Sequence, residues 1–385
     1  MTRACMRFVA LAGLVIITAC GSVGSDTRQG SPSPVGTSLS PSTSPSASPS
    51  ASSKFGFVFR TWDGTAYGLE LENSDGSGKM VLSGSNFAHP DLLRFVESRN
   101  RRWAAWANGG DLLVAASTNL SSATTVVTSG KSLSPLAVSE DGATVAYVVR
   151  TTNDPTTMAS ELHVVYVQDR STKLLHTFSG PFINCLGDGA FDALAQRLIA
   201  VGCGSGQAAG LVLMSTSDGS IISEDDQFFA WPDQWAFSQD LKSVWLINDS
   251  ASESDIVLYD VATRSRQVLY RSPVWHQSDG SAAPNLPGFL PLSPDGSKLV
   301  FTRYPPDRSA EIYVISSAGG PATMIFKSNT VSRLESWAPD GASVAVFVDN
   351  STPAQRIRLV DVRSQSAIPI DTGTAFAELL AWLVA

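Results

Sequence analysis

A ten-residue pattern recurs along this chain and limits the folds that are open to it. Its clearest copies span 138–147, 292–301 and 337–346, where an apolar residue precedes Ser-Pro-Asp-Gly or a close variant and a β-branched or aromatic run follows. Proline presets φ at the second position of a type I turn, and glycine tolerates the exit geometry. Each copy therefore predicts two strands joined by a tight turn. Their repetition predicts an array of units that bury their faces against one another.

One apolar or aromatic residue stands before each turn and allows the repeats to be counted. We place these markers at Val96, Val138, Phe191, Phe237, Leu292, Trp337 and Trp382. They are about 40–55 residues apart, which is typical of the four-stranded blades of a β-propeller. The copies that follow Val96 and Phe191 are degenerate, because they lack the Pro-Asp-Gly core.

The two ends of the repeat array complement each other. Residues 54–60 read as the second strand of a repeat, and residues 378–383 read as a first strand with no second strand after it. Together they complete one blade, so we predict an all-β, seven-bladed propeller over 55–385 that is closed by the C-terminal strand. A six-bladed ring is the alternative count. Because closure leaves no open blade interface, we expect a monomer.

The repeat chemistry resembles that of a known family. The segments 293–296, 299–301 and 312–314, together with Asn73-Ser-Asp-Gly-Ser-Gly78, are similar to the TolB-like (WD-repeat-like) propeller repeat. The resemblance implies a propeller across 55–385. It carries over no TolB role, because TolB has six blades and an extra N-terminal domain that this chain lacks. Scaffolds, peptidases and sugar-active enzymes share this fold, so the fold alone implies no function.

The N-terminal residues have the features of an export signal. Residues 1–19 combine Arg3 and Arg7 with a short apolar run and small residues before Cys20. The tetrad 17–20 resembles the lipobox of bacterial lipoproteins, which implies that Cys20 becomes the lipid-bearing N-terminus. A plain signal peptide with an incidental cysteine is the alternative. Residues 20–54 are rich in Ser and Pro and predict a tether with a reach on the order of 30 Å. We therefore expect a lipid-anchored protein on the extracytoplasmic face of a bacterial cell membrane.

The net charge limits the classes of partner that the protein can bind, and the cysteine content bears on whether disulfides form. The net charge of −8 disfavours nucleic acid as a partner. Cys185 and Cys203 flank a predicted hairpin that turns near Leu194, which would place them opposite each other. An exported protein folds where disulfides form, so we predict a Cys185–Cys203 disulfide. Two separate buried thiols are the alternative.

The longer predicted loops lie on the face opposite the tight turns, and loops of this kind often carry binding sites. Two of these links are rich in aromatic and polar side chains that suit a sugar or a partner chain, and they supply the possible binding face: Trp231, Trp235, Trp275, His276 and Asp279. The alternative is that the tryptophans pack as plugs between blades.

No catalytic pattern stands out in the sequence. There is no Gly-x-Ser-x-Gly elbow and no P-loop. His163 and His176 could begin a metal site, but no third ligand is evident. We therefore expect no catalytic residues, no metal and no cofactor, and we predict a non-catalytic binding or scaffold module for an unknown protein or glycan partner. The alternative is a carbohydrate-active hydrolase or lyase whose site lies in the propeller funnel.

Overall fold

A computed structural model describes the chain from residue 55 onward with several gaps. The described residues are 55–62, 67–73, 80–87, 94–108, 110–129, 131–150, 159–179, 185–203, 209–225, 228, 235–249, 254–272, 275–276, 282–283, 286, 290–307, 309–329, 332–348, 357–370 and 377–384. The predicted signal, Cys20 and the predicted tether up to residue 54 lie outside them.

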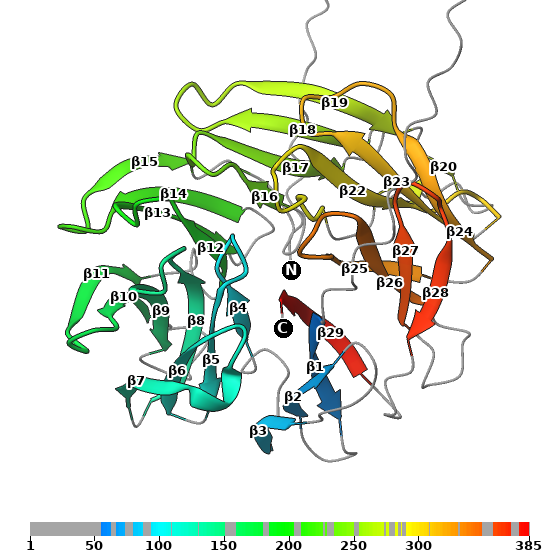
Figure 1. Cartoon of the computed structure of the whole chain (residues 1–385). Coiled ribbons are helices and arrows are strands. Elements are labelled where there is room, and N and C mark those ends of the chain that lie inside the picture. Colours follow the sequence, from blue (N-terminus) through cyan, green and yellow to red (C-terminus); the bar gives the residue numbers. More distant parts are fainter. Residues whose placement is uncertain are drawn as a thin grey trace, which may run out of the picture. The chain divides into compact units, whose positions relative to one another are not determined.

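Antiparallel sheets radiate from a central channel (Figure 1). Within the described residues, six four-stranded sheets and one three-stranded sheet form the ring, and a two-stranded pair stands apart from them. The prediction of an all-β, seven-bladed propeller is therefore confirmed, and the six-bladed alternative is wrong. Blade 6 has only a bridge, Leu292 to Leu299, in place of its innermost strand.

Strand bounds follow blade by blade, from the channel outward. Blades 1 to 4 comprise β29 (Ala377–Val384), β1 (Phe55–Trp62), β2 (Tyr67–Asn73) and β3 (Met80–Phe87); β4 (Phe95–Glu97), β5 (Trp103–Asn108), β6 (Asp111–Ala116) and β7 (Thr124–Thr128); β8 (Leu133–Val138), β9 (Thr144–Arg150), β10 (Ala159–Tyr166) and β11 (Thr172–Ser179); β12 (Cys185–Phe191), β13 (Arg197–Cys203), β14 (Ala209–Ser215) and β15 (Ile221–Asp225). A short 3-10 turn, η2 (Leu120–Ser122), precedes β7.

The remaining blades have the same outward order. Blades 5 to 7 and the separate pair comprise β16 (Trp235–Phe237), β17 (Ser243–Asp249), β18 (Ser254–Asp260) and β19 (Arg266–Ser272); β22 (Lys298–Arg303), β23 (Ala310–Ser316) and β24 (Thr323–Ser328); β25 (Ser332–Trp337), β26 (Ser343–Val348), β27 (Ile357–Asp361) and β28 (Ala367–Ile370); β20 (Trp275–His276) and β21 (Ala282–Ala283).

The C-terminal strand closes the ring, as the sequence predicts. β29 pairs with β1 in antiparallel register, with Phe57 opposite Trp382 and Val58 opposite Ala381. The rings of Phe57 and Trp382 lie 5.2 Å apart, centroid to centroid. Blade 1 is thus built from the two ends of the repeat array, and each end supplies hydrogen bonds that the other lacks.

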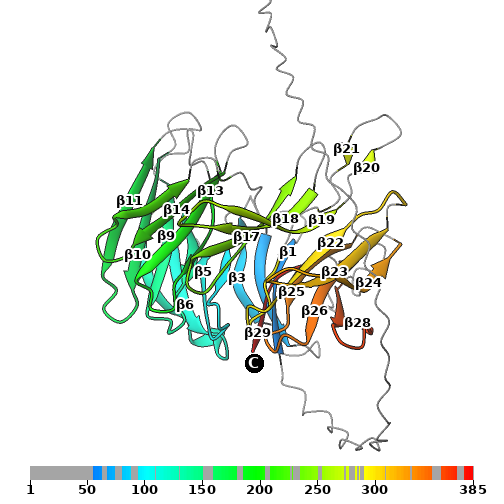
Figure 2. The same cartoon turned by 90° about the horizontal axis from the view of Figure 1, so that it is seen from above.

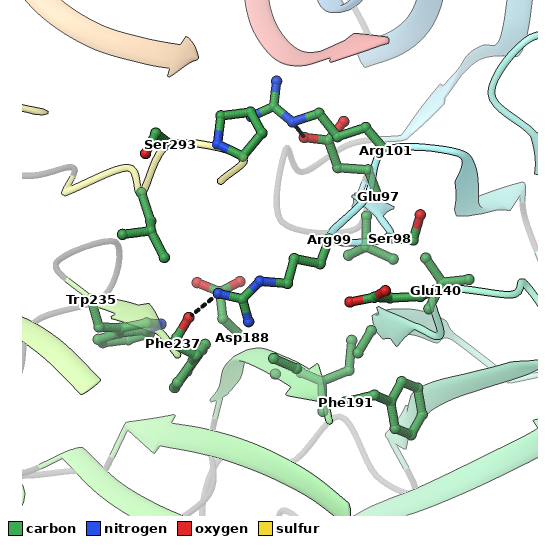
Figure 3. Close-up of a pocket in the computed structure, with 18 residues that line it drawn as sticks. Glu97, Ser98, Arg99, Arg101, Glu140, Asp188, Phe191, Trp235, Phe237 and Ser293 are labelled. Atoms are coloured by element: carbon green, nitrogen blue, oxygen red, sulfur yellow. Dashed lines mark hydrogen bonds and ion pairs between the residues drawn. The ribbon is translucent and has the colours of Figure 1, made fainter. Parts of the chain in front are cut away.

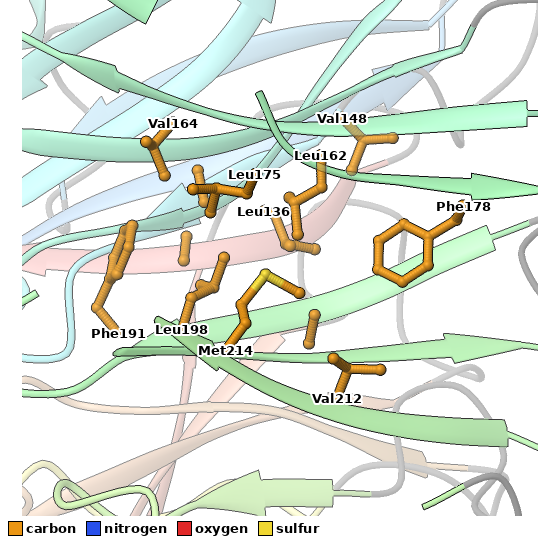
Figure 4. Close-up of a cluster of buried hydrophobic side chains, with 13 residues drawn as sticks. Leu136, Val148, Leu162, Val164, Leu175, Phe178, Phe191, Leu198, Val212 and Met214 are labelled. Atoms are coloured by element: carbon orange, nitrogen blue, oxygen red, sulfur yellow. The ribbon is translucent and has the colours of Figure 1, made fainter. Parts of the chain in front are cut away.

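Buried hydrophobic clusters lie between neighbouring blades rather than in one central core. Between blades 3 and 4, Leu162 and Val164 pack with Leu198 and Met214 (Figure 4). Every other neighbouring pair shares such a cluster, including blades 7 and 1. Burial of each large apolar side chain contributes roughly 1.5–3 kcal/mol to the free energy of folding. The packing between neighbouring blades therefore holds the ring together, and the central channel takes no part in it.

The repeated turn owes its shape to a few recurring hydrogen bonds. Oγ of Ser293 donates to Oδ1 of Asp295 at 2.6 Å, and the backbone N–H of Lys298 donates to Oγ of Ser293 at 2.9 Å. The N–H of Gly296 donates to the carbonyl of Ser293, and Gly296 has a φ of 74°. The last turn position is therefore left-handed, which explains the preference for glycine there.

The copy in blade 2 corrects one detail of the sequence reading. Oγ of Ser98 donates to Oδ1 of Asn100 at 2.8 Å, and the N–H of Trp103 donates to Oγ of Ser98 at 3.0 Å. Ser98 and Asn100 thus take the roles of the motif serine and aspartate. The residue before the turn is therefore Glu97, and the prediction of Val96 as the marker is wrong by one residue.

The two faces of the ring differ as the strand order predicts. Inner strands lead into the tight turns, so these turns lie at the end of the channel where β29 ends. We call this end the turn face. Figure 2 shows the β20–β21 pair and the end of β29 on opposite sides of the ring. Within the part of the chain that the structure describes, no helix has the length and apolar character to cross a membrane.

Candidate ligand-binding site in the channel

A cavity of about 340 Å³ lies in the channel where the inner strands enter their turns (Figure 3). Blades 2 to 6 all contribute to its wall. The polar lining comes chiefly from Glu97, Arg99, Glu140 and Asp188. The apolar lining includes Leu136, Phe191, Trp235, Phe237 and Pro294. The site is therefore a polar pocket with aromatic and aliphatic walls, held by strands from five blades.

Two arginines of the β4–β5 turn reach across the channel. Nη2 of Arg99 in blade 2 donates to the carbonyl oxygen of Phe237 in blade 5 at 2.7 Å. Nη1 of Arg101 donates to the carbonyl of Trp337 in blade 7 and, at 3.4 Å, to that of Trp382 in blade 1. One turn thus connects four blades through main-chain oxygens that the inner strands leave facing the channel.

The local sequence explains why this turn differs from the others. In the copy at 293–296, proline and glycine occupy the second and fourth turn positions, where blade 2 has Arg99 and Arg101. Arg101 has a φ of 56°, the left-handed conformation that Gly142, Gly296 and Gly341 adopt in three other copies and that Ala195 and Leu241 adopt in two. A side chain in that conformation is strained. The buried hydrogen bonds of Arg101 offset that cost, and they give the residue a role that glycine lacks.

Glu97 occupies the position that is apolar in the other blades. Its Oε1 lies 3.4 Å from Nε of Arg101, and its Oε2 is buried without a hydrogen-bond partner among the described residues. Burial raises the pKa of the Glu97 carboxyl, and the charge of Arg101 opposes the shift only in part. The site therefore contains a carboxyl group that holds its proton more tightly than usual.

Asp188 is the second perturbed acid. Its Oδ1 lies 3.7 Å from Nη1 of Arg94, and 45% of its side-chain surface is exposed. The walls of the channel still desolvate the carboxyl in part and raise the pKa of Asp188, while the charge of Arg94 and the nearby indole N–H of Trp235 oppose that change. Nε1 of Trp235 is buried and makes no hydrogen bond of ordinary geometry within the described residues. Its N–H therefore lies near the Asp188 carboxylate without forming a full hydrogen bond to it.

Arg99 lies between the acidic groups. Figure 3 shows its side chain extending from the turn toward Phe237, with Asp188 beside it. Burial lowers the pKa of the Arg99 guanidinium, and the charges of Glu140 and Asp240 oppose the shift. Nε2 of Gln239 donates to Oε1 of Glu140 at 3.2 Å, which joins blades 3 and 5 at the mouth of the cavity.

Of the residues predicted to form the binding face, Trp235 lines the cavity. Trp275 and His276 form β20, which pairs with β21, and nothing further is described for their side chains. Trp231 and Asp279 lie outside the described residues, so a site on the long-loop face stays a prediction. Sequence reasoning missed Glu97, Arg99, Asp188 and Glu140. The available signal was the replacement of proline and glycine by arginine in one copy of the turn.

The backbone register places Cys185 of β12 directly opposite Cys203 of β13, as the hairpin reading expects. The disulfide itself stays a prediction. His163 pairs in register with Leu174 and its ring stacks on Tyr147, whereas His176 packs edge-on against Phe178. The two histidines therefore lie on opposite faces of their sheet. Among the described residues, no group of three or more His, Cys, Asp or Glu side chains could hold a metal ion.

Comparison with known proteins supports the fold and nothing finer. No protein-family model matches the chain. No curated protein matches it in sequence. An oligogalacturonate lyase from Vibrio parahaemolyticus is 13% identical, with a TM-score of 0.53 over 77% of this chain and 84% of the lyase. TolB from Acinetobacter baumannii is 14% identical, with a TM-score of 0.48 over 85% of this chain and 81% of TolB.

A manganese-bound oligogalacturonate lyase is similar to the same degree. It is 12% identical, with a TM-score of 0.54 over 77% of this chain and 83% of the lyase. Sequence identities this low indicate a shared arrangement of strands and give no information about the chemistry of a site. The β-propeller predicted from the repeat motifs is thus confirmed at the level of fold.

Proposed function

We propose that this protein is a lipid-anchored, extracytoplasmic binding module that holds a protein or glycan partner at the turn face of its channel and performs no chemistry on it. The lipobox-like segment ending at Cys20 and the Ser/Pro-rich tether support the anchoring. The propeller supplies a rigid support, because its inner strands are fixed by packing between neighbouring blades.

One observation carries the binding role. The channel cavity contains two buried polar atoms that make no hydrogen bond of ordinary geometry with the described residues, namely Nε1 of Trp235, which lies near Asp188, and Oε2 of Glu97. Leaving such a group unpaired costs about 1–3 kcal/mol, and a ligand that pairs with it recovers that free energy. Concave sites with apolar walls and a few convergent polar groups are the usual places for ligands.

Site-specific photocrosslinking in membranes tests this role. A photoreactive residue at exposed Gln239 lies at the mouth of the cavity, while one at exposed Asp307, in the β22–β23 loop, lies on the opposite face. We expect a crosslinked partner from position 239 and none from position 307. Crosslinks from position 307 alone would overturn the proposed site.

The anchoring is tested separately. Cys20→Ser removes the thiol that would carry the lipid, so we expect the variant in the soluble fraction and the unmodified chain in the membrane fraction. Cys5→Ser, upstream in the same segment, is the matched control and should stay with the membrane. A Cys20→Ser protein that still sediments with membranes would contradict lipid anchoring.

A second candidate is a carbohydrate-active enzyme, and the raised pKa values of Glu97 and Asp188 favour it. A carboxyl whose pKa is raised keeps its proton to a higher pH than an ordinary acid, which suits it to act as a general acid. The fold is similar to that of oligogalacturonate lyase, which makes lyase activity on sugar acids a reasonable assay. Product formation that Glu97→Gln and Asp188→Asn both abolish would replace the binding role with catalysis.

A further inference from the structure

The ionisable side chains around the channel cavity are of both signs. Glu97, Glu140 and Asp188 line it together with the guanidinium groups of Arg99 and Arg101, and Asp240 acts on Arg99 from outside the lining. Arg94 supplies a third positive charge, 3.7 Å from Asp188. A charged ligand would therefore lose its hydration without finding an unopposed counter-charge, and that loss is expensive in a concave site.

The unused hydrogen-bonding capacity is mixed. The buried indole N–H of Trp235 is a donor that lies near Asp188 but makes no hydrogen bond of ordinary geometry within the described residues, whereas Oε2 of Glu97 and the exposed oxygens of Asp188 accept. An anion would satisfy only donors, and an ammonium group would satisfy only acceptors. A hydroxyl group both donates and accepts, so a ligand with several hydroxyls matches this set of groups.

The apolar walls and the volume of the cavity set further limits on the ligand. Leu136, Phe191, Phe237 and Pro294 present apolar surface to the cavity, and Trp235 adds an aromatic side chain. The volume of about 340 Å³ is at the small end of the usual range for ligand pockets. A ligand with an apolar ring face, hydroxyls at its edge and the size of one or two sugar rings meets these conditions.

We infer that the channel cavity takes an uncharged, polyhydroxylated ligand, one or two neutral sugar rings, with hydroxyls bridging Asp188 and Arg99 and a ring face against Trp235. This inference rests on the proposed function, because it names the ligand class for the same site. It places recognition in the channel, among residues from blades 2, 4 and 5.

Calorimetric titration of the full chain carrying Cys20→Ser tests the ligand class. The probes are neutral hexoses (glucose, galactose and mannose) and the charged counterparts of each, the 2-amino sugar and the 6-carboxylate. We expect at least one neutral hexose to bind, and its charged counterparts to bind at least about tenfold more weakly, since each leaves buried groups unpaired. Tighter binding of a charged counterpart would overturn the inference.

Two variants test the location. Asp188→Asn should weaken binding of the neutral sugar by at least about tenfold, because one accepting carboxylate oxygen is replaced by an amide NH2 group that can only donate. Asp218→Asn carries the same change in an exposed turn of blade 4 outside the cavity and should bind as the parent does. Thermal melting of both variants verifies that they fold. Equal affinity for Asp188→Asn and the parent would overturn the assignment.

The outcomes separate this inference from the proposed function. If none of the sugars binds while position 239 still crosslinks a partner, the ligand class is wrong and the binding role stands. If position 239 crosslinks nothing and a neutral sugar binds in an Asp188-dependent manner, the site and its ligand stand and the macromolecular partner is wrong.

Discussion

Nη2 of Arg99 donates a hydrogen bond to the carbonyl oxygen of Phe237 at 2.7 Å, and this contact joins blade 2 to blade 5 across the channel. Arg101, two residues later, reaches the carbonyls of Trp337 and Trp382. The same turn therefore lines the candidate site and braces the ring. Arg99 lines the cavity, so its substitution should mainly affect ligand binding. Arg101 is buried, so its substitution should mainly affect the stability of the fold.

Replacing Arg101 by methionine should destabilise the ring. The change leaves Glu97 and two carbonyl groups without the buried guanidinium, and breaking a buried charge pair costs about 3 kcal/mol. The melting temperature of the variant should fall by several degrees. Arg102→Met is the matched control, because Arg102 is exposed and adjacent, and it should melt as the parent does. Equal melting temperatures for both variants would contradict the bracing role.

The buried carboxyl of Glu97 predicts a pH dependence. Its folded-state pKa lies above the ordinary value of 4.5, so the folded chain holds the proton more tightly than the unfolded chain. Stability is therefore lost as pH rises from about 4.5 through the folded-state pKa. Glu97→Gln removes this loss, and the stability of the variant relative to the parent should increase between pH 4 and pH 8. Denaturant unfolding of both proteins at several pH values measures the difference in their free energies of unfolding. A difference that stays constant with pH would refute the prediction.

Closure by β29 predicts that the last strand supports the whole ring. Trp382 is 1% exposed and packs against Phe57 in the cluster between blades 7 and 1. Trp382→Ala should cost about 3–5 kcal/mol, and deletion of 377–385 should prevent cooperative unfolding altogether. Exposed Ile368, in outer strand β28, offers the control Ile368→Ala, which should change little. A truncated chain that melts like the parent would show that closure is dispensable.

Two motif glycines should respond differently to alanine. Gly296 has a φ of 74° and no heavy atom within 4 Å of the position that a Cβ would occupy. Gly296→Ala should therefore cost only the backbone strain, about 1 kcal/mol. Gly142 has a φ of 71°, and a Cβ there would overlap the indole of Trp103, so Gly142→Ala should cost distinctly more. Denaturant midpoints compare the two, and the reverse order would contradict this account of the turn.

The register of β12 and β13 allows a direct test of the predicted disulfide. Cys185 and Cys203 are opposite each other, and a bond between them would join the β12–β13 hairpin at its open end. Thiol titration of the denatured, exported protein should find neither thiol free, and reduction should release both. Cys185→Ser should then expose one reactive thiol. Two free thiols in the unreduced parent would show that Cys185 and Cys203 are not bonded to each other.

Local sequence was sufficient for most of the architecture. The tight turns at 138–147 and 292–301, the pairing of the first and last strands, and the opposition of Cys185 and Cys203 all follow from short-range patterns, since turn chemistry and alternation determine a hairpin and its register. The reading of blade 2 was wrong by one residue, because arginines stand where proline and glycine normally identify the turn.

The candidate site required the tertiary structure. Glu97, Arg99, Asp188 and Trp235 lie on three different blades, and no local pattern relates residues that are so far apart along the chain. Their approach depends on how seven sheets pack around one axis. The sequence by itself determined the repeat, the number of blades and the way in which the ring closes. Only the closed ring decided which inner-strand residues meet in the channel, because it brings the inner strands of five blades and their turns together into one shared wall.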